Sequence, residues 1–322
     1  MSDQIKRSVK GWVPVKLFTE RECLQCRWLY VGDKNFTEPF FDDTIAARRV
    51  LPENGFLNIR ISSIDELADR IKEVDAIQPT AFIFHISRCG STLVSQMLGI
   101  QSSNIVLSEV PFFDELLRYG KKHDRMPEIL PQLKAAVGLY GAKRNEDHQH
   151  LFIKADSWHI HFYKELRILY PGVPFFLLYR KPVEVLRSQQ KKRGMHALPN
   201  FLEPAIFGFD EDKISTMHLD EYMGLVIEGY LHAFLDILQK DRSAYAINYH
   251  DGAMEIINII AAVTSLQISE EEKKLMQERS GFHAKFPTQV FTEKMPDEPI
   301  PAYLKRSGEL YHKIEEIRSS SL

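Results

Sequence analysis

Two segments of the chain each run from an apolar strand into a polar turn and then into a helix. The first is AFIFHI (81–86), which leads into Ser87-Arg88-Cys89-Gly90-Ser91-Thr92 and a helical pattern over 93–98. The second is FFLLY (175–179), which leads into Arg180-Lys181-Pro182 and a helical pattern over 183–188. The unpaired N–H groups and partial positive charge at a helix start attract anions. Two such turns predict a ligand with two separated phosphates.

The first turn differs from the loop that binds nucleoside triphosphates. In that loop a lysine follows the last glycine and reaches the terminal phosphates, whereas Ser91 follows Gly90 here. The cation is Arg88, two residues before the glycine, and Thr92 supplies a second hydroxyl. Backbone amides, two hydroxyls and a guanidinium are suited to one phosphate. The turn has no obvious means of holding a triphosphate with its metal.

The second turn strengthens this interpretation. Arg180 ends a strand, and Pro182 suits the first turn of the helix that follows. Ser188 lies roughly two helical turns beyond Arg180 and therefore faces back toward the strand end. We expect Arg180 and Ser188 to hold one phosphate together.

In order and spacing, Arg88 to Thr92 and Arg180 to Ser188 resemble the two signatures of the sulfotransferases that use 3′-phosphoadenosine 5′-phosphosulfate (PAPS). The resemblance spans roughly residues 80 to 290. It implies a three-layer α/β sandwich with a central, mainly parallel sheet, similar to P-loop nucleoside triphosphate hydrolases. It also implies that residues 87–92 bind the 5′-phosphosulfate and that Arg180 and Ser188 bind the 3′-phosphate. No metal is required.

The resemblance further implies the catalytic residues. Glu109 follows the apolar run 105–107 and would be the catalytic base, as in family branches with a glutamate at this strand end. The alternative is that Glu109 caps a helix beginning near Pro111. Arg88, with the amides of 88–92, would hold the 5′-phosphate and its bridging oxygen, and Lys154 would be a second cation there. Whether Lys154, His250 or Lys285 joins the site is left open.

The implied activity is transfer of a sulfuryl group from PAPS to a hydroxyl or amine of a small-molecule acceptor. The net charge of −3 gives no electrostatic footprint for nucleic acid. One alternative is a P-loop NTP-dependent kinase or hydrolase, which would need a lysine after Gly90. Another is a relative that binds the nucleotide without catalysis. The sequence identifies neither the acceptor nor an oligomeric state.

The chain length predicts one large domain over 76–322 with a smaller N-terminal addition over 1–75. In the addition we expect a strand near 24–31, a helix near 42–50, and a helix that begins at Ser63 with Glu66 completing a capping box. In the large domain strands are expected at 81–86, 105–107, 151–154, 174–179 and 244–249, and helices at 219–238 and 251–266.

Polar residues follow each of the five predicted strands of the large domain. They are Arg88, Glu109, Lys154, Arg180 and His250. Ligands of open α/β sheets bind at the carboxyl ends of the strands. We therefore expect these side chains to converge on one crevice.

The cysteines and histidines offer weaker alternatives. Cys23 and Cys26 are spaced for metal or redox chemistry but lie in a predicted strand, and Cys89 is interpreted as a small filler residue in the first turn. The histidine pairs have a spacing of two, which suits strands or loops better than a helical metal site: His148 and His150, His159 and His161. Three cysteines, a polar N-terminus and no long apolar run predict a cytoplasmic protein.

Overall fold

The computed structural model describes residues 8–282 and 300–320. The chain divides into two compact units, of which the first comprises residues 1–80 and 101–153 and the second 81–100 and 154–322. The boundary that we expected at residue 75 stays a prediction.

The central sheet has five strands in the order β5-β6-β4-β7-β8. They are β4 (Ala81–His85), β5 (Asn104–Ser108), β6 (His150–Lys154), β7 (Phe175–Tyr179) and β8 (Ala244–Asn248). β7 pairs in parallel with β4 and with β8. Every residue of β4, β5 and β7 is buried, as expected for apolar runs covered on both faces. The predicted α/β fold, a central parallel sheet flanked by helices in three layers, is confirmed.

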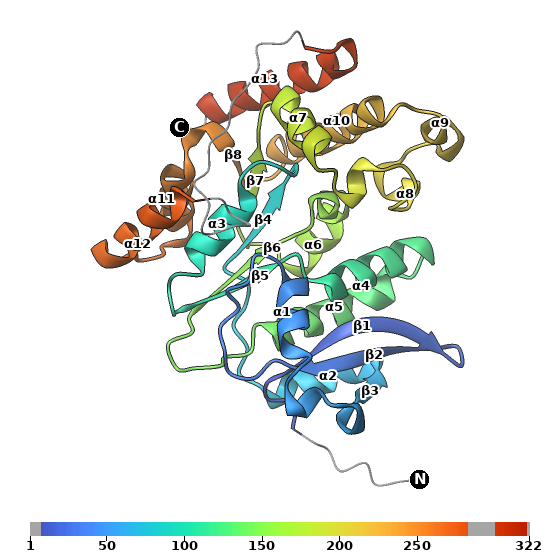
Figure 1. Ribbon diagram of the computed structural model, residues 1–322, viewed down its shortest axis with the longest axis vertical. Coiled ribbons are helices and arrows are strands. Elements are labelled where there is room, and N and C mark those ends of the chain that lie inside the picture. The colour runs from blue at the N-terminus through green and yellow to red at the C-terminus, as the bar shows by residue number, and fades with distance from the viewer. Residues whose placement is uncertain (1–7, 283–299, 321–322) are drawn as a thin grey trace. The chain divides into compact units, whose positions relative to one another are not determined.

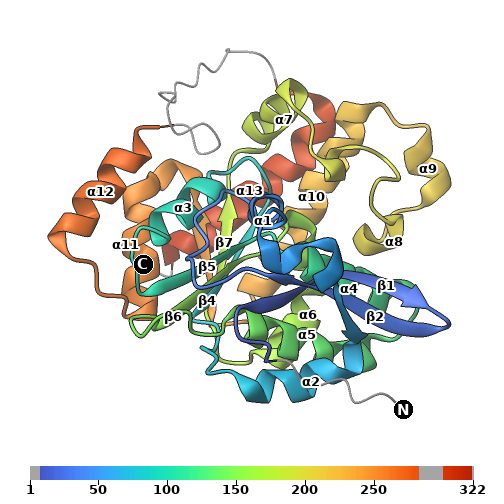
Figure 2. The same cartoon turned by 60° about the horizontal axis from the view of Figure 1, so that its bottom comes forward.

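The first unit contains a second, antiparallel sheet with the order β1-β2-β3. Its strands are β1 (Trp12–Glu20), β2 (Cys23–Tyr30) and β3 (Arg60–Ser63), and its α-helices are α1 (Phe41–Arg48), α2 (Leu67–Arg70), α4 (Pro111–Lys122) and α5 (Met126–Tyr140). Figure 2 shows the long β1–β2 hairpin beside α4 and α5. The Tyr140 hydroxyl donates to the Pro14 carbonyl at 2.5 Å and so ties α5 to β1.

The second unit carries the longer helices at the C-terminal end of the chain. Its α-helices are α3 (Ser91–Leu98), α6 (Tyr163–Leu169), α7 (Pro182–Lys191), α8 (Pro204–Phe207), α9 (Glu211–Ser215), α10 (Leu219–Leu238), α11 (Ala253–Thr264), α12 (Glu270–Ser280) and α13 (Lys305–Ser320). α10 and α13 lie side by side, and α3, α11 and α12 form another group (Figures 1 and 2). Short 3₁₀ turns join the elements of both units: Pro52–Asn54, Phe56–Asn58, Ile64–Glu66, Ile71–Glu73, Ser157–Phe162, Met195–Ala197, Tyr249–Asp251 and Ala302–Leu304.

The helix expected from Ser63 is wrong in detail. The segment is a 3₁₀ turn (Ile64–Glu66), then the short α2, then a second 3₁₀ turn (Ile71–Glu73). The Ser63 hydroxyl accepts the N–H of Asp65, two residues on, which suits a 3₁₀ start rather than the expected capping box with Glu66. Across the described residues, no helix combines the length and apolar character that a bilayer span requires.

Candidate functional site

The turn between β4 and α3 has an unusual backbone. Ser87 and Arg88 adopt positive φ angles of 67° and 54°, and Gly90 follows with 78°. Such angles are strained for residues with a side chain and are found disproportionately at functional sites. At Gly90 a Cβ atom would also lie 3.1 Å from the Tyr249 ring. Both features favour glycine at this position, and α3 starts directly after it at Ser91.

Ser87 is fixed by the helix that follows the second turn. Its N–H donates to His85 Nδ1 at 3.1 Å, and its hydroxyl accepts from the buried Gln189 amide of α7 at 3.0 Å. The Gln189 carbonyl in turn accepts the N–H of Gly194 at 2.9 Å, and its nitrogen lies 3.0 Å from His196 Nε2. The first turn and the end of α7 are therefore held as one piece.

Arg88 points toward the end of α7. Its Nη2 donates to the carbonyls of Ser188 and Lys192, at 3.2 and 2.6 Å. A cation at a helix C-terminus is favoured by the helix dipole, and burial lowers the pKa of this guanidinium. The phosphate contact expected of the Arg88 side chain stays a prediction, but this side chain already has a structural role.

Cys89 is buried within the same turn. Its thiol donates to the Leu178 carbonyl at 3.4 Å, and burial raises its pKa to about 12. A thiol with such a pKa stays protonated near neutral pH and is a poor nucleophile. The interpretation of Cys89 as a small buried residue agrees with these contacts.

Lys154, the last residue of β6, reaches the first turn. It is fully buried, and its Nζ donates to the Thr92 hydroxyl at 3.4 Å. The structure thus brings a second cation to the start of α3. Lys285 lies outside the described residues.

Arg180 joins the two turns. Its Nη1 donates to the Arg88 carbonyl at 3.2 Å, and its guanidinium lies over the Tyr249 ring at 4.2 Å from the centroid. Its Nε also forms a 2.6 Å ion pair with Glu184, in the first turn of α7. Ser188, the expected partner of Arg180, is connected to it through Arg88, which binds the Ser188 carbonyl.

His250 lies close to the same carboxylate. Its Nε2 is 3.0 Å from Glu184 Oε2, and nearly half of its side chain is exposed. Three of the five residues expected at the strand ends are therefore linked by short chains of contacts: Arg88, Arg180 and His250. Lys154 contacts Thr92, in the helix that follows the first turn.

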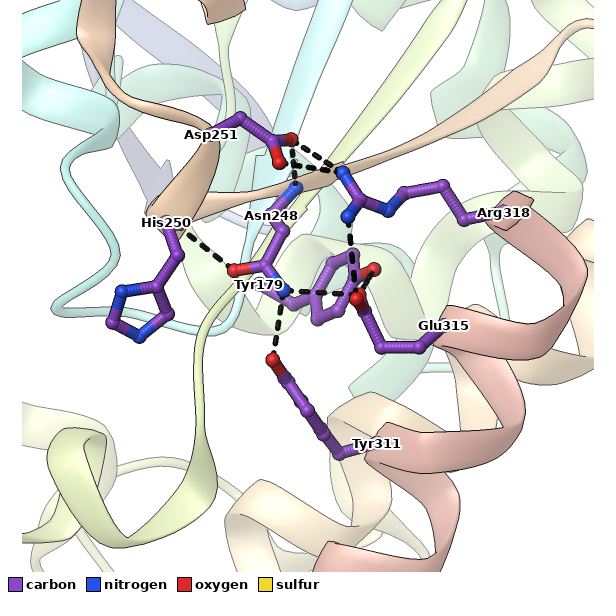
Figure 3. Close-up of polar contacts among 7 residues, drawn as sticks. All are labelled: Tyr179, Asn248, His250, Asp251, Tyr311, Glu315 and Arg318. Carbon is purple, nitrogen blue, oxygen red and sulfur yellow. Dashed lines mark hydrogen bonds and ion pairs between the residues drawn. The ribbon is translucent and has the colours of Figure 1, made fainter. Parts of the chain in front are cut away.

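Behind the second turn, α13 binds the ends of β7 and β8 (Figure 3). Glu315 accepts hydrogen bonds from the Tyr179 hydroxyl and from the Asn248 amide. Arg318 binds both carboxylate oxygens of Asp251, at 2.6 and 2.7 Å. Tyr179 immediately precedes Arg180, so α13 supports the strand end from which the second turn begins.

Glu109 belongs to the first unit and has its own backbone strain. Its φ is 53°, directly after β5. The N-cap of α4 is Val110, so Glu109 lies one residue outside the cap position that the alternative interpretation gave it. Burial raises the pKa of Asp42, and the negative charges of Asp43 and Glu109 add to this rise. The Asp42 carboxylate therefore lies near Glu109, the predicted catalytic base.

The cysteine alternative and the metal alternative for His148 receive no support from their local geometry, whereas His159 Nε2 lies 3.6 Å from the Asp156 carboxylate. Cys23 is exposed and Cys26 is buried at opposite faces of β2. Burial raises the pKa of Cys26 to about 11. His148 Nε2 lies 2.7 Å from the Asn35 side-chain oxygen, within a hydrogen-bonded loop.

Sequence reasoning missed three residues that shape the site, namely Glu184, Gln189 and Tyr249. The Arg180–Glu184 pair has the i, i+4 spacing of helix ion pairs and could have been found from it. Gln189 and Tyr249 carried no such signal, because their partners Ser87 and Gly90 are distant in sequence.

Comparisons with known proteins give a consistent but distant result. No protein-family model matches the chain, and no curated protein matches it. A sulfotransferase domain from the curacin biosynthetic pathway is 13% identical with a TM-score of 0.49, covering 74% of this chain and 99% of its own.

Two further solved structures are also sulfotransferases. One, from Alicyclobacillus acidocaldarius, is 13% identical with a TM-score of 0.37, covering 76% of this chain and 92% of its own. The other, from Mycobacterium avium, is 14% identical with a TM-score of 0.42, covering 88% of this chain and 83% of its own. At such identities and TM-scores these similarities carry no functional argument, which has to come from the site itself.

Proposed function

We propose that this protein is a sulfotransferase that moves a sulfuryl group from PAPS to a hydroxyl or amine of a small-molecule acceptor. The observation that carries the proposal is the hydrogen bond from Arg180 Nη1 to the Arg88 carbonyl. This hydrogen bond connects the two turns, each of which precedes a helix. A nucleotide with a 5′-phosphosulfate and a 3′-phosphate carries the two separated anions that the connected turns would bind.

In the proposed reaction the acceptor oxygen or nitrogen attacks the sulfur, and the bond from sulfur to the bridging phosphate oxygen breaks. The electron pair of that bond stays on 3′-phosphoadenosine 5′-phosphate. Glu109 takes the acceptor proton, an effect worth about 10²- to 10⁴-fold in rate. Lys154 and the amides of the first turn offset negative charge on the leaving phosphate, as in phosphoryl transfer.

A nucleotide panel tests the donor against the rival NTP-dependent function. We expect 3′-phosphoadenosine 5′-phosphate to raise the melting temperature without magnesium, and Mg-ATP to have a much smaller effect. The first turn has Ser91 where a triphosphate loop carries lysine. A larger shift with Mg-ATP would instead establish the kinase or hydrolase alternative.

Glu109→Gln tests the chemistry. The amide keeps the shape of the side chain but accepts no proton, so we expect product formation to fall at least about 100-fold. The products would be detected by mass spectrometry after incubation with PAPS and a pool of small alcohols, phenols and amines. Binding of 3′-phosphoadenosine 5′-phosphate should stay unchanged. Full activity in a stable variant would refute the assignment, and donor binding without products from the wild type would favour a non-catalytic protein.

A further inference from the structure

Glu315, near the end of α13, binds the last residues of two neighbouring strands. Its Oε1 accepts hydrogen bonds from the Tyr179 hydroxyl, at the end of β7, and from Asn248 Nδ2, at the end of β8. Figure 3 shows both side chains reaching the same carboxylate, and the two residues are paired across the parallel strands. Both are almost completely buried. One carboxylate therefore fixes the ends of β7 and β8 relative to each other.

The Glu315 carboxylate is itself held by a closed ring of polar contacts. Arg318 Nη2 donates to Glu315 Oε2 at 3.2 Å, and Arg318 Nη1 binds both oxygens of Asp251. Asp251 Oδ2 accepts the Asn248 N–H at 3.1 Å, and the Asn248 amide returns to Glu315 at 2.9 Å. Hydrogen bonds to charged groups are about twice as strong as neutral ones. The ring therefore holds the carboxylate in one orientation.

The Tyr179 hydroxyl is a permanent donor in this arrangement. Burial raises the pKa of Tyr179, and the hydrogen bond to Glu315 raises it further. The hydroxyl therefore stays protonated at and above neutral pH. The Tyr311 ring of α13 packs edge-on against the Tyr179 ring, with centroids 5.6 Å apart, and limits its movement.

This support reaches Arg180 first along the chain, because Arg180 directly follows Tyr179. Arg180 is buried, and its Nη1 and Nε bind the Arg88 carbonyl and Glu184. A guanidinium binds phosphate through a rigid, planar fork of N–H groups. A shift of the Arg180 backbone would therefore change the direction of that fork, and the bond from Tyr179 to α13 restrains this backbone.

A second route to Arg180 passes through the 3₁₀ turn Tyr249–Asp251. Asn248 and Asp251 form a capping box at the start of this turn, and both bind side chains of α13. Within the turn, the Tyr249 ring lies with its centroid 4.2 Å from the Arg180 guanidinium. By holding the turn, α13 therefore also sets where this ring meets Arg180.

We propose that Glu315 is a positioning residue for the second turn and gives the protein its preference for nucleotides with a 3′-phosphate. This inference rests on the function proposed above, in which Arg180 binds that phosphate. In this assignment Glu315 touches no part of the nucleotide and acts on Arg180 through Tyr179 and Asn248. Charged groups of a binding site need support that holds them within about 0.5 Å of the productive position. The ring around Glu315 supplies that support.

Isothermal titration with 3′-phosphoadenosine 5′-phosphate and adenosine 5′-monophosphate tests the proposal. The two nucleotides differ only in the 3′-phosphate, so the ratio of their dissociation constants, monophosphate over bisphosphate, measures discrimination by that group. We expect a ratio of at least about ten for the wild type. Tyr179→Phe removes one hydroxyl and keeps both the buried ring and the charge of Glu315. It should lower the ratio about threefold and change the affinity for the monophosphate less than about twofold.

Glu315→Met removes the hydrogen bonds to both strand ends and should lower the ratio about three- to tenfold. Its matched control is Glu228→Met, which also removes one carboxylate that anchors α13. Glu228 of α10 forms a 3.1 Å ion pair with Arg306, in the first turn of α13. Because the Arg306 side chain is exposed, this control should keep the ratio within about twofold of the wild type.

Melting temperatures of the free proteins separate positioning from a purely structural role, which would lower the melting temperature and leave the ratio unchanged. The proposal is overturned if Tyr179→Phe and a folded Glu315→Met both keep the wild-type ratio, or if Glu228→Met lowers it as much as Glu315→Met. If Glu315→Met does not fold, Tyr179→Phe alone decides. A wild-type ratio near one is a different failure, because it would refute the proposed 3′-phosphate site and this inference with it.

Discussion

Arg144 in the first unit and Arg167 in the second are both half-buried arginines stacked on a phenylalanine ring. Arg167 lies 3.6 Å from the centroid of Phe175, and its Nη2 forms a 2.7 Å ion pair with Asp241. Its Nη1 donates to three backbone carbonyls just before β7: Tyr170, Pro171 and Val173. Arg144 has the same stacking, but within residues 8–282 and 300–320 its guanidinium binds one carbonyl and forms no ion pair with a carboxylate. The same residue type is thus ion-paired with a carboxylate in one unit and, among the described residues, has no such partner in the other.

The largest expected effect concerns Arg167, the arginine with a carboxylate partner. Arg167→Met leaves Asp241 without its cation and the three carbonyls without their donor, so we expect the free energy of unfolding to fall by about 2–4 kcal/mol. Arg144→Met removes a charge that has no carboxylate partner in the described part of the chain, and we expect little loss of stability or a gain. Urea unfolding of both variants measures the difference. Equal destabilisation would mean that Arg144 is structural as well.

Arg180 sharpens the comparison, because it has a carboxylate partner and is still proposed to bind phosphate. Arg180→Ala should weaken binding of 3′-phosphoadenosine 5′-phosphate at least about tenfold, or about 1.5–3 kcal/mol. Binding of adenosine 5′-phosphosulfate, which lacks the 3′-phosphate, should barely change. Titration of both nucleotides decides the matter, and equal losses would contradict the assignment of Arg180 to the 3′-phosphate.

Glu184→Gln would leave Arg180, which is buried, without the carboxylate to which it is ion-paired. The amide removes a negative charge next to the proposed phosphate, so affinity for 3′-phosphoadenosine 5′-phosphate should rise by about two- to tenfold. The protein without nucleotide should become less stable. His250→Gln is the matched control, since it leaves the Arg180–Glu184 pair intact. An unchanged or weaker affinity in Glu184→Gln would mean that Glu184 mainly orients Arg180.

The smallest expected effect is a pH dependence around Arg144. Burial lowers the pKa of His148 below its ordinary value of 6.5, and the charge of Arg144 adds to this. As the pH falls below 6.5, His148 is protonated in the unfolded chain before it is protonated in the folded protein. Acidification therefore favours the unfolded state, and the free energy of unfolding falls. In His148→Asn this contribution is absent. The stability difference between wild type and variant should shrink on acidification, and a constant difference would contradict the expectation.

Much of the fold could be predicted because its strands are continuous apolar runs. The five strands of the central sheet were expected within about two residues of their observed ends, and the helix at 219–238 is α10. β1 was missed because Pro14 interrupts its pattern, and the pairing with β2 shifts register between Pro14 and Lys16. The segment after Ser63 has a helical pattern, but its 3₁₀ turns depend on local hydrogen bonds that a periodicity does not encode.

The candidate site was less predictable. The two turns carry local signals, the Gly90 position and the Pro182 helix start, which sequence can reveal. The contact from Arg88 to the Ser188 carbonyl and that from Gln189 to Ser87 each join residues about one hundred positions apart. Such contacts depend on the packing of α7 against the first turn. Residue types near either turn do not specify them.

The bonds between α13 and the ends of β7 and β8 have a consequence for biosynthesis. Tyr179 and Asn248 leave the ribosome long before Glu315, which accepts hydrogen bonds from both. The strand end that carries Arg180 therefore gains its support only when translation of α13 is complete. A nascent chain that stalls before α13 would contain both nucleotide turns and yet present an unsupported second turn.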